Sequence, residues 1–482
     1  MNTVRWFRQP HAWLILSTAV FVIYFSLTAW FRHVNFYTSM YDLGNMDSVL
    51  WHTLHGKWFV MTDPTAIIQQ SRTAYHADFL LLGYLPFYAL WSDPRVMMII
   101  QVLAVASGAI PLFWLGRKLL SPTAGALFSI AYLTYPGLLW ALIFDVHAVV
   151  LAAPLLLWAF WAIMEHRFWL YGVFIGLALL SKEEVGLVVG LLGLYFLFTK
   201  HPRVVSIATA IVGFGWSALI LGWAIPTART VNEHFAIGYF SEFGGTTGEV
   251  FRNVATNPLA VIRHLFRFDS LGYVAWLLWP LSFTSLLGWP LLLVAAPEFG
   301  INLLSNNPNL RSIFFHYASV ITPLVFLAAL TGLSWWRRKF AFGKRFKALA
   351  LTAMIGVWAV ALYSGAPLPG TRHHEDAVRV FRPSPYRATI AEIKRRLPPN
   401  AKVAVTNSLA PHFTQRDWAW MFPLALDRAD AAIILLGGRV EVKSRAELRA
   451  AVRQLSDDPA WRLVIHQDQL YYFERVRSLA QT

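Results

Sequence analysis

The sequence predicts a mainly α-helical, polytopic membrane protein with about eleven transmembrane helices, followed by a small C-terminal α/β domain. Three observations lead to this prediction. Apolar residues make up 57% of the 482 residues and charged residues only 14%, and the mean hydropathy is +0.48, which is typical of chains that fold within a bilayer. The apolar residues form segments separated by short basic loops. This grouping stops at Ala366.

The composition also excludes several classes of site. There is no cysteine, so disulfides, thiolate metal sites and cysteine nucleophiles are ruled out. The net charge of +15 would favour nucleic acid in a soluble protein, but much of it lies in short loops between apolar segments. Because lysine and arginine concentrate in the cytoplasmic loops of membrane proteins, we expect no nucleic-acid partner.

The first apolar segment, residues 13–31, follows two arginines and is long enough to cross about 30 Å of hydrocarbon. It lacks the shorter core and the cleavage site of a signal peptide, so we interpret it as an uncleaved anchor. With the N-terminus inside, residues 32–78 become an outer loop. Within that loop, residues 41–55 carry apolar side chains at helical spacing, which predicts a helix lying on the membrane surface.

The charges between the later segments set their orientation. Residues 79–91 are short enough to be a re-entrant piece or part of a broken span, and residues 226–270 form a second outer loop. In this arrangement the inner loops hold thirteen lysines or arginines and one acid, Glu165, as expected for cytoplasmic loops. The remaining predicted spans cover residues 95–115, 124–144, 148–164, 168–180, 185–198, 204–225, two short segments divided near 285–288, 313–332 and 346–363.

Residues 366–482 form the predicted C-terminal α/β domain, and the number of spans places it outside the membrane. Residues 386–396 and 444–455 have helical periodicity, and Ser444 with Glu447 three positions later is the pattern of a capping box. Short strand-like runs occupy residues 402–407, 431–436, 461–466 and 469–475.

Two carboxylates, Asp42 and Asp47, stand just after the first span. Acids at the edge of a bilayer are costly unless they serve a function, so we interpret Asp42 as a catalytic base and Asp47 as a catalytic partner. The alternatives are that Asp42 caps a surface helix and that Asp47 is a solvated side chain.

Other polar residues reach the same predicted side from separate spans, which is typical of a cavity open to that face. The triplet Lys182-Glu183-Glu184 divides two apolar segments that are too short to cross alone, although a hairpin with an internal ion pair would look the same. The candidates for binding the substrate or its phosphate are Lys182, Glu183, Glu298, Arg311, His316 and Tyr317. Glu298 could instead be a helix-start acid, and His316 a buried core histidine.

A metal site is a further hypothesis. His76, Asp145 and His147 could hold a divalent cation such as Mg²⁺ or Mn²⁺ through imidazole and carboxylate ligands, but they have no strict ligand spacing. The alternative is that all three are ordinary loop residues.

Seven motifs, in order over nearly the whole chain, resemble a prokaryotic membrane family called domain of unknown function 2079. The resemblance implies the GT-C type of glycosyltransferase fold for residues 1–365 and the use of polyprenyl-phosphate sugars. The members of this type have an acidic motif in the first outer loop. The resemblance implies that Asp42 is the first acid of that motif and Asp47 the second. The chain departs from the family at Ser48, where Gln is common, and at Ala77-Asp78, where Phe-Ser is frequent. The motifs are YDLGNMDSVLWHTLHG, YHADFLLLGYLPFYAL, LIFDVHA, LLSKEEVGL, APEFGINLLS, FFHYASVITPL and VAVTNSLAPHFTQR.

The resulting hypothesis is a membrane glycosyltransferase on the outer side of a bacterial or archaeal plasma membrane. It would transfer a sugar from a polyprenyl-phosphate donor to a glycan, lipid or protein acceptor of the cell envelope, because such transfer needs a carboxylate base and cations that hold the leaving phosphate. Two alternatives belong to other classes: a transporter or flippase of a lipid-linked saccharide, and a non-catalytic scaffold for envelope assembly.

Overall fold

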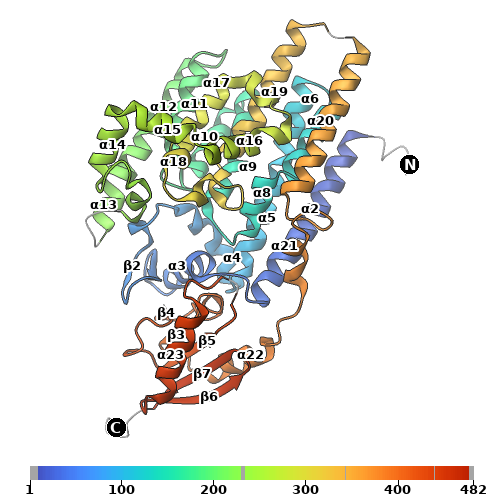
Figure 1. Ribbon diagram of the computed structural model, residues 1–482. Coiled ribbons are helices and arrows are strands. Elements are labelled where there is room, and N and C mark those ends of the chain that lie inside the picture. The colour runs from blue at the N-terminus through green and yellow to red at the C-terminus, as the bar shows by residue number, and fades with distance from the viewer. Residues whose placement is uncertain (1–8, 230–233, 342, 439, 477–482) are drawn as a thin grey trace.

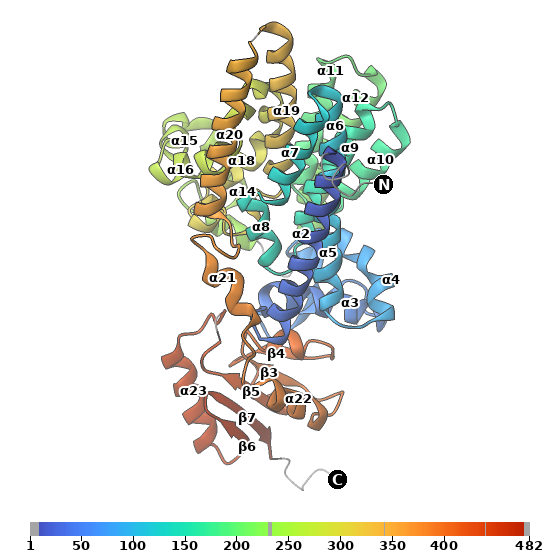
Figure 2. The same cartoon turned by 90° about the vertical axis from the view of Figure 1, so that its right-hand side faces the viewer.

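The computed structural model describes residues 9–229, 234–341, 343–438 and 440–476. Two bodies are visible in Figure 1, a large helical membrane region and a smaller sheet region at one end of it. The turn between α19 and α20 lies at the opposite end from the sheet region, and the view turned by 90° shows the same separation (Figure 2).

Six helical stretches in the described residues are long and apolar enough to cross a membrane, or seven if a bent pair counts as one span. This confirms the predicted class, a polytopic helical membrane protein. The stretches are α2 (Pro10–Val34), α5 with α6 (Arg95–Ser107 and Ala109–Leu119), α12 with α13 (Arg203–Leu219 and Ile225–Ala228), residues 284–304 with α17 (Trp289–Leu292) and α18 (Ala296–Leu304), α19 (Ile321–Lys339) and α20 (Lys344–Gly365).

The bent pair consists of α7 (Pro122–Leu133) and α8 (Pro136–Ile143), which meet at an angle of 42°. The bend lies at Pro136, because proline has no backbone N–H to continue the helix and keeps the preceding residue extended. Four further apolar helical stretches are shorter: residues 79–90 including α4 (Leu85–Leu90), residues 148–164 including α9 (Ala152–Met164), α10 (Phe168–Leu179) and α11 (Val185–Leu197).

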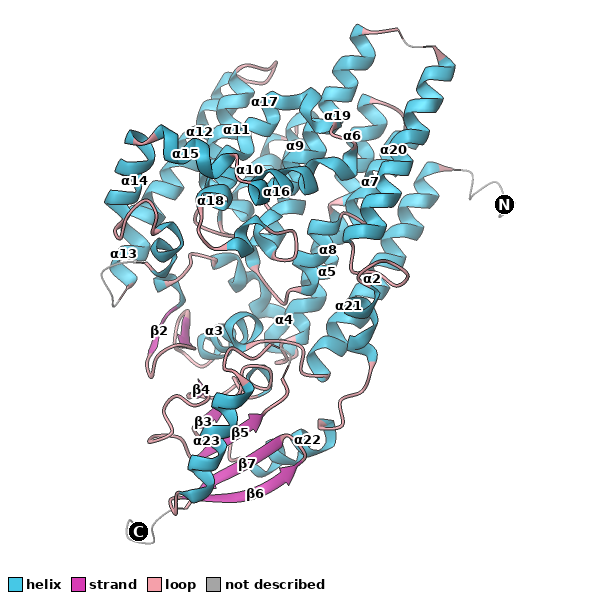
Figure 3. Ribbon diagram, in the orientation of Figure 1, coloured by secondary structure: helices cyan, strands magenta, loops and turns pink. Residues whose placement is uncertain are grey.

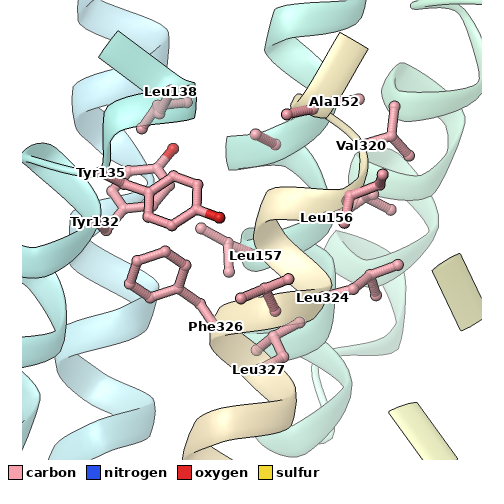
Figure 4. Close-up of a cluster of buried hydrophobic side chains, with 14 of the residues drawn as sticks. Tyr132, Tyr135, Leu138, Ala152, Leu156, Leu157, Val320, Leu324, Phe326 and Leu327 are labelled. Atoms are coloured by element: carbon pink, nitrogen blue, oxygen red, sulfur yellow. The ribbon is translucent and has the colours of Figure 1, made fainter. Parts of the chain in front are cut away.

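The core of the membrane region is built around α19, whose apolar window is 83% buried, whereas that of α20 is only 6% buried. Figure 4 shows the rings of Tyr132, Tyr135 and Phe326 meeting in this core. Phe326 meets both tyrosines edge to face, at ring-centre distances of 5.7 and 5.3 Å. Helix α20 therefore lies at the edge of the bundle, as expected for a helix that faces lipid.

Helices α11 and α12 approach closely because glycines face each other across their contact. A Cβ atom on Gly213 would lie 2.3 Å from the backbone nitrogen of Gly190, so a side chain there would force the helices apart. Small residues that allow backbones to meet are the usual means of packing helices within a bilayer.

Between α16 (Phe268–Leu278) and the stretch that follows it, the chain turns at residues 279–283 rather than at the predicted 285–288. Ser282 and Phe283 both have left-handed backbone angles there, which interrupts the helical path of the chain. The predicted break at 285–288 is instead a packed 3-10 turn, in which the Ser285 hydroxyl donates to the Val325 carbonyl.

The loop predicted at residues 32–78 is folded rather than extended. A π turn at Met40–Gly44 leads into α3 (Asn45–Leu54), and β1 (Val60–Thr62) pairs antiparallel with β2 (Gln69–Ser71). Leu43, Met46 and Leu50 are buried, so the helix packs between the two bodies instead of lying on a lipid surface. The second loop contains α14 (Thr247–Thr256) and α15 (Pro258–Leu265).

After α20 come α21 (His374–Val378) and the C-terminal sheet region, residues 387–475 (Figure 3). Its sheet has the strand order β4-β3-β5-β7-β6, in which β3 is parallel to β4 and β5, and β7 is antiparallel to β5 and β6. The strands are β3 (Val403–Val405), β4 (Ala419–Met421), β5 (Ala431–Leu435), β6 (Trp461–Gln467) and β7 (Leu470–Arg475).

Helices cover both faces of this sheet. Val403 and Val405 pack toward α22 (Arg387–Arg396), whereas Ala404 between them packs toward α23 (Arg445–Asp457). The predicted capping box is present, since the Ser444 side chain accepts from the Glu447 N–H and the Glu447 carboxylate accepts from the Ser444 N–H.

Candidate functional site at the junction of the two bodies

Asp42 lies in the π turn after the first helix. Ser39 caps this turn, since its hydroxyl oxygen accepts from the Asp42 N–H at 3.2 Å and its O–H donates to Asp42 Oδ2 at 2.6 Å. Asp42 does not cap the helix; Ser39 does. The Asp42 side chain is 23% exposed, so its carboxylate is fixed in place and still accessible.

The second oxygen of this carboxylate meets His147 from the turn between α8 and α9. His147 Nε2 lies 3.1 Å from Asp42 Oδ1, and because a carboxylate only accepts, the ring N–H donates. The His147 ring is stacked on His316 with ring centres 3.9 Å apart, and Phe144 lies on it as well. Gln101 accepts from the His147 backbone N–H at 3.0 Å and holds the turn in place.

Asp145 fastens the turn that carries His147 to the turn that carries Asp42. Its carboxylate accepts from Arg32 at 3.1 Å and from the Ser39 backbone N–H at 2.8 Å. Burial raises the pKa of Asp145 to about 6, and the nearby charge of Asp42 acts in the same direction, while Arg32 opposes it. Asp145 therefore supports the site rather than facing a ligand with free oxygens.

Asp42 lies on the wall of a cavity of about 870 Å³ between the membrane region and the sheet region, here called the junction cavity. Two arginines, Arg32 and Arg379, share its lining with aromatic side chains and with a loop of the sheet region. A concave site that combines charged and amide side chains with aromatic ones is suited to binding an amphipathic ligand. The lining residues are Arg32, Tyr37, Ser39, Tyr41, Asp42, Trp140, Ile143, Phe144, Asp145, Asn309, Phe314, Phe315, Asp376, Arg379, Asn407, Val440, Glu441 and Val442.

Asp47 is not on this cavity. It is fully buried, and its carboxylate accepts from the Thr414 and Tyr88 hydroxyls at 2.5 Å each and from the Gln415 amide at 3.2 Å. Two of these donors come from the sheet region, so Asp47 joins the two bodies. Burial raises the pKa of Asp47 to about 6, although the three hydrogen bonds act against this shift.

The Lys182-Glu183-Glu184 break forms a separate buried cluster. Lys182 pairs with Glu184 at 2.6 Å, and Glu183 pairs with His76 at 2.8 Å and accepts from the Ala77 N–H at 3.1 Å. Burial acts to lower the pKa of Lys182, but the charges of Glu184, Glu183 and the nearby Glu298 outweigh it and raise this pKa. The internal ion pair weighed as an alternative is therefore present.

The other predicted substrate-binding residues are placed differently. Glu298 is a buried acid in the first turn of α18. Arg311 lies 2.7 Å from Asp269 in an ion pair away from Asp42. His316 lies against His147, and Tyr317 touches the His316 ring. Of this set, only His316 contacts a residue that holds Asp42.

The three predicted metal ligands do not converge. His76 binds Glu183, Asp145 binds Arg32, and His147 binds Asp42. Within residues 9–229, 234–341, 343–438 and 440–476, no three His, Asp or Glu side chains are grouped to hold a metal ion. His76, Asp145 and His147 therefore form no common ligand set in the described residues, because each side chain has a different charged partner, and metal dependence stays a prediction.

Sequence reasoning missed the cationic and C-terminal parts of the cavity wall. Arg32 and Arg379 look like ordinary flanking charges of a span and of a linker, and Asn407 and Glu441 lie in loops of the sheet region. The one available signal was the motif VAVTNSLAPHFTQR, which contains Asn407 but had no assigned role.

The sequence profile of a family described as "Predicted membrane protein (DUF2079)" matches residues 32–470. The chain belongs to this family. Among curated proteins, no sequence matches this DUF2079 member. Its fold, however, is shared by solved structures. Structures of ArnT from Cupriavidus metallidurans, one bound to undecaprenyl phosphate, superpose with a TM-score of 0.55 at 12% identity. The match to the bound form covers 98% of this chain and 99% of that one.

The Archaeoglobus fulgidus oligosaccharyltransferase, tethered to an acceptor peptide with an NVT sequon, gives a TM-score of 0.41 at 14% identity, over 85% of this chain and 63% of that one. This DUF2079 protein is a multi-pass membrane protein with an ArnT-like fold.

Proposed function

We propose that this protein is a membrane glycosyltransferase that transfers a sugar from a polyprenyl-phosphate donor to an acceptor of the cell envelope, with Asp42 as general base. The observation that carries the proposal is the Asp42 carboxylate, fixed by Ser39 and His147 and accessible from the junction cavity. A general base must be within reach of the proton that it accepts and held in a defined direction, and this carboxylate meets both needs.

The cavity offers groups for both parts of a lipid-linked sugar. Arg32 and Arg379 are the cations on its wall, and arginine suits phosphate because its planar donors match the phosphate oxygens. Trp140 and Phe144 supply apolar surface for a sugar ring or the first isoprene unit. The ArnT-like fold supports this assignment, since that protein is bound to undecaprenyl phosphate.

In the proposed reaction, an acceptor hydroxyl lies against Asp42, which takes its proton. The acceptor oxygen then bonds to the anomeric carbon of the sugar, while the bond from that carbon to the phosphate oxygen breaks with inversion. The leaving phosphate keeps the electron pair, and Arg379 and Arg32 stabilise its added charge.

We orient the chain with the junction cavity outside the cytoplasm. At the opposite end, three basic turns meet, since Lys118 lies 2.8 Å from Glu165 and Arg337 donates to the Leu120 carbonyl. Clustered lysine and arginine mark the cytoplasmic side of membrane proteins, which supports our proposal that the sheet region lies in the extracytoplasmic space of a bacterial or archaeal plasma membrane. Glycan, lipid or protein acceptors of the envelope would meet the cavity there.

The proposal is tested by incubating the purified protein in lipid nanodiscs with a panel of polyprenyl-phosphate sugars and measuring release of polyprenyl phosphate. We expect one donor class to be consumed, with the wild type active and Asp42→Asn inactive. Asp93→Asn is the matched control, because Asp93 belongs to an ion pair with Arg95 and does not line the cavity. Consumption of no donor by the wild type would contradict the proposal.

A further inference from the structure

The turn that carries Asp42 is bound by a loop of the sheet region that lies more than 360 residues later in the chain. The Met40 backbone N–H, two positions before Asp42, donates to the Asn407 carbonyl oxygen at 3.1 Å and to the Asn407 side-chain Oδ1 at 2.9 Å. Both acceptors therefore come from one residue of the motif VAVTNSLAPHFTQR.

Side chains in and just before this turn also pack against the sheet region. Phe36 and Met40 belong to the same buried cluster as Ile393 of α22 and Leu409 and Phe413 of the loop after β3. Met40 itself is fully buried. The first turn of the Asp42 segment is thus fixed at its backbone and at its side chain by the C-terminal part of the chain.

Asn407 is itself held firmly. Its backbone N–H donates to Glu441 Oε2 at 2.9 Å and its side-chain amide donates to the Val440 carbonyl. The other Glu441 oxygen accepts from the Ser408 N–H at 2.9 Å. A hydrogen-bonded chain therefore runs from Glu441 through Asn407 to Met40, and both Glu441 and Asn407 line the junction cavity.

Asn407 is not needed to keep the two bodies together, because other contacts do this. His412 stacks on His33 with ring centres 4.0 Å apart, Thr414 binds Asp47, and Asp417 forms a 2.6 Å ion pair with Lys57. Of these, the Lys57 contact joins residues outside the Asp42 turn, whereas Thr414 also lies beside Gly44 at the end of that turn. The Asn407 contact is made to the backbone of that turn. It therefore acts on the geometry of the turn rather than on holding the membrane region and the sheet region together.

We infer that Asn407 is a positioning residue of the transfer reaction, through which the sheet region sets the direction of the Asp42 carboxylate. The inference rests on the proposed function. Displacing a catalytic base by about 1 Å can lower the rate roughly 100-fold, so a residue that fixes the backbone two positions before Asp42 acts on turnover through the position of that base.

The test compares Asn407→Ala with Asp417→Asn, since each removes one contact between the two bodies but only the first touches the Asp42 turn. Hydrogen exchange of a peptide covering residues 37–44 should become faster in Asn407→Ala and stay unchanged in Asp417→Asn. In the donor assay, Asn407→Ala should lower kcat about 10- to 100-fold with the donor KM within about twofold of wild type. Asp417→Asn should keep both values.

Wild-type kcat in Asn407→Ala, or equal exchange in both variants, would overturn the inference. If Asn407→Ala does not fold, Glu441→Gln provides a second variant, because it weakens the contacts that hold Asn407 and keeps Asn407 itself. This variant must give faster hydrogen exchange at residues 37–44 and a lower kcat. Unchanged exchange and unchanged kcat would also overturn the inference. The exchange measurement does not depend on turnover, so a failure of the proposed function would appear separately, as a wild type that consumes no donor.

Discussion

Asp42 and Asp47 lie five positions apart in one motif, yet the fold gives them opposite environments. The Asp42 side chain is 23% exposed on the wall of a cavity, whereas Asp47 is fully buried and receives three hydrogen bonds from neighbouring side chains. One carboxylate can meet a ligand and the other cannot without rearrangement. Spacing in a motif therefore does not assign roles to its acids; accessibility and partners do.

The same contrast separates the junction cavity from the Lys182 cluster. Lys182 and Glu184 pair with each other, their side chains are only 17% and 11% exposed, and neither lines the cavity, whereas Arg379 lies on its wall. We therefore treat the cavity as the open, ligand-binding region and the Lys182 and Asp47 clusters as closed, stabilising ones.

The largest expected effect on stability comes from Lys182→Met. Removing one partner of a buried ion pair leaves the other charge uncompensated, which should cost about 3–5 kcal/mol of unfolding free energy. Thermal unfolding in detergent measures this change, and the affinity for polyprenyl phosphate should be unchanged. If the variant had normal stability but bound the donor poorly, Lys182 would belong to the open, ligand-binding region instead.

Two variants control this experiment. Lys118→Met removes an exposed pair with Glu165 and should cost less than about 1 kcal/mol. Adding Glu184→Gln to Lys182→Met removes both charges of the buried pair and should restore part of the lost stability.

A pH effect of intermediate size should come from Asp47. Its pKa is raised from the ordinary value of 3.8 to about 6, so between these values the folded protein holds a proton that the unfolded chain has lost. Stability should therefore fall as pH rises from about 4 to 6, by up to about 3 kcal/mol for this group. Unfolding free energies measured across this range check the sign.

Asp47→Asn serves as its control, because it keeps the shape of the side chain but cannot ionise. The variant should lose part of the pH slope. The rest should remain, since the pKa of Asp145 is also raised by burial to about 6. An identical slope in wild type and variant would mean that Asp47 is not the closed, desolvated acid described here.

The smallest effect is expected for Arg379→Met. Arg379 lines the cavity and is paired with Asp376 at 2.9 Å, so its loss should leave the fold intact. Losing one charged donor to a phosphate should weaken binding of polyprenyl phosphate by about tenfold. Isothermal titration calorimetry in nanodiscs measures the affinity for polyprenyl phosphate. Full retention of this affinity would show that Arg379 is not part of the ligand-binding region.

The local features of this fold could be predicted from the sequence because they depend on neighbouring residues. The apolar runs placed the long helices, and the Ser444 and Glu447 pattern gave the capped start of α23. The strand-like runs at 402–407 and 431–436 became β3 and β5. Strand β4 was not predicted from the sequence, and it is fixed by its parallel pairing with β3.

The site could be predicted only in part, because its decisive contacts join distant segments. Asp42 was recognised as a candidate, but nothing near Asp47 in the chain shows that Thr414 will bind it. Likewise, the apolar face of the helix expected on the membrane surface at residues 41–55 is buried, because it packs against residues of the membrane region such as Leu81 and Met98. Burial of this kind depends on tertiary contacts, and periodicity does not reveal it.

The most direct test of the central claim compares Asp42→Asn and Asp47→Asn in one transfer assay with the donor that the wild type consumes. The account predicts that Asp42→Asn loses at least about 100-fold in kcat while remaining folded, since general-base catalysis contributes roughly 100- to 10,000-fold. Asp47→Asn should keep a rate within a few fold of wild type. Loss of transfer in Asp47→Asn together with normal transfer in Asp42→Asn would contradict the account.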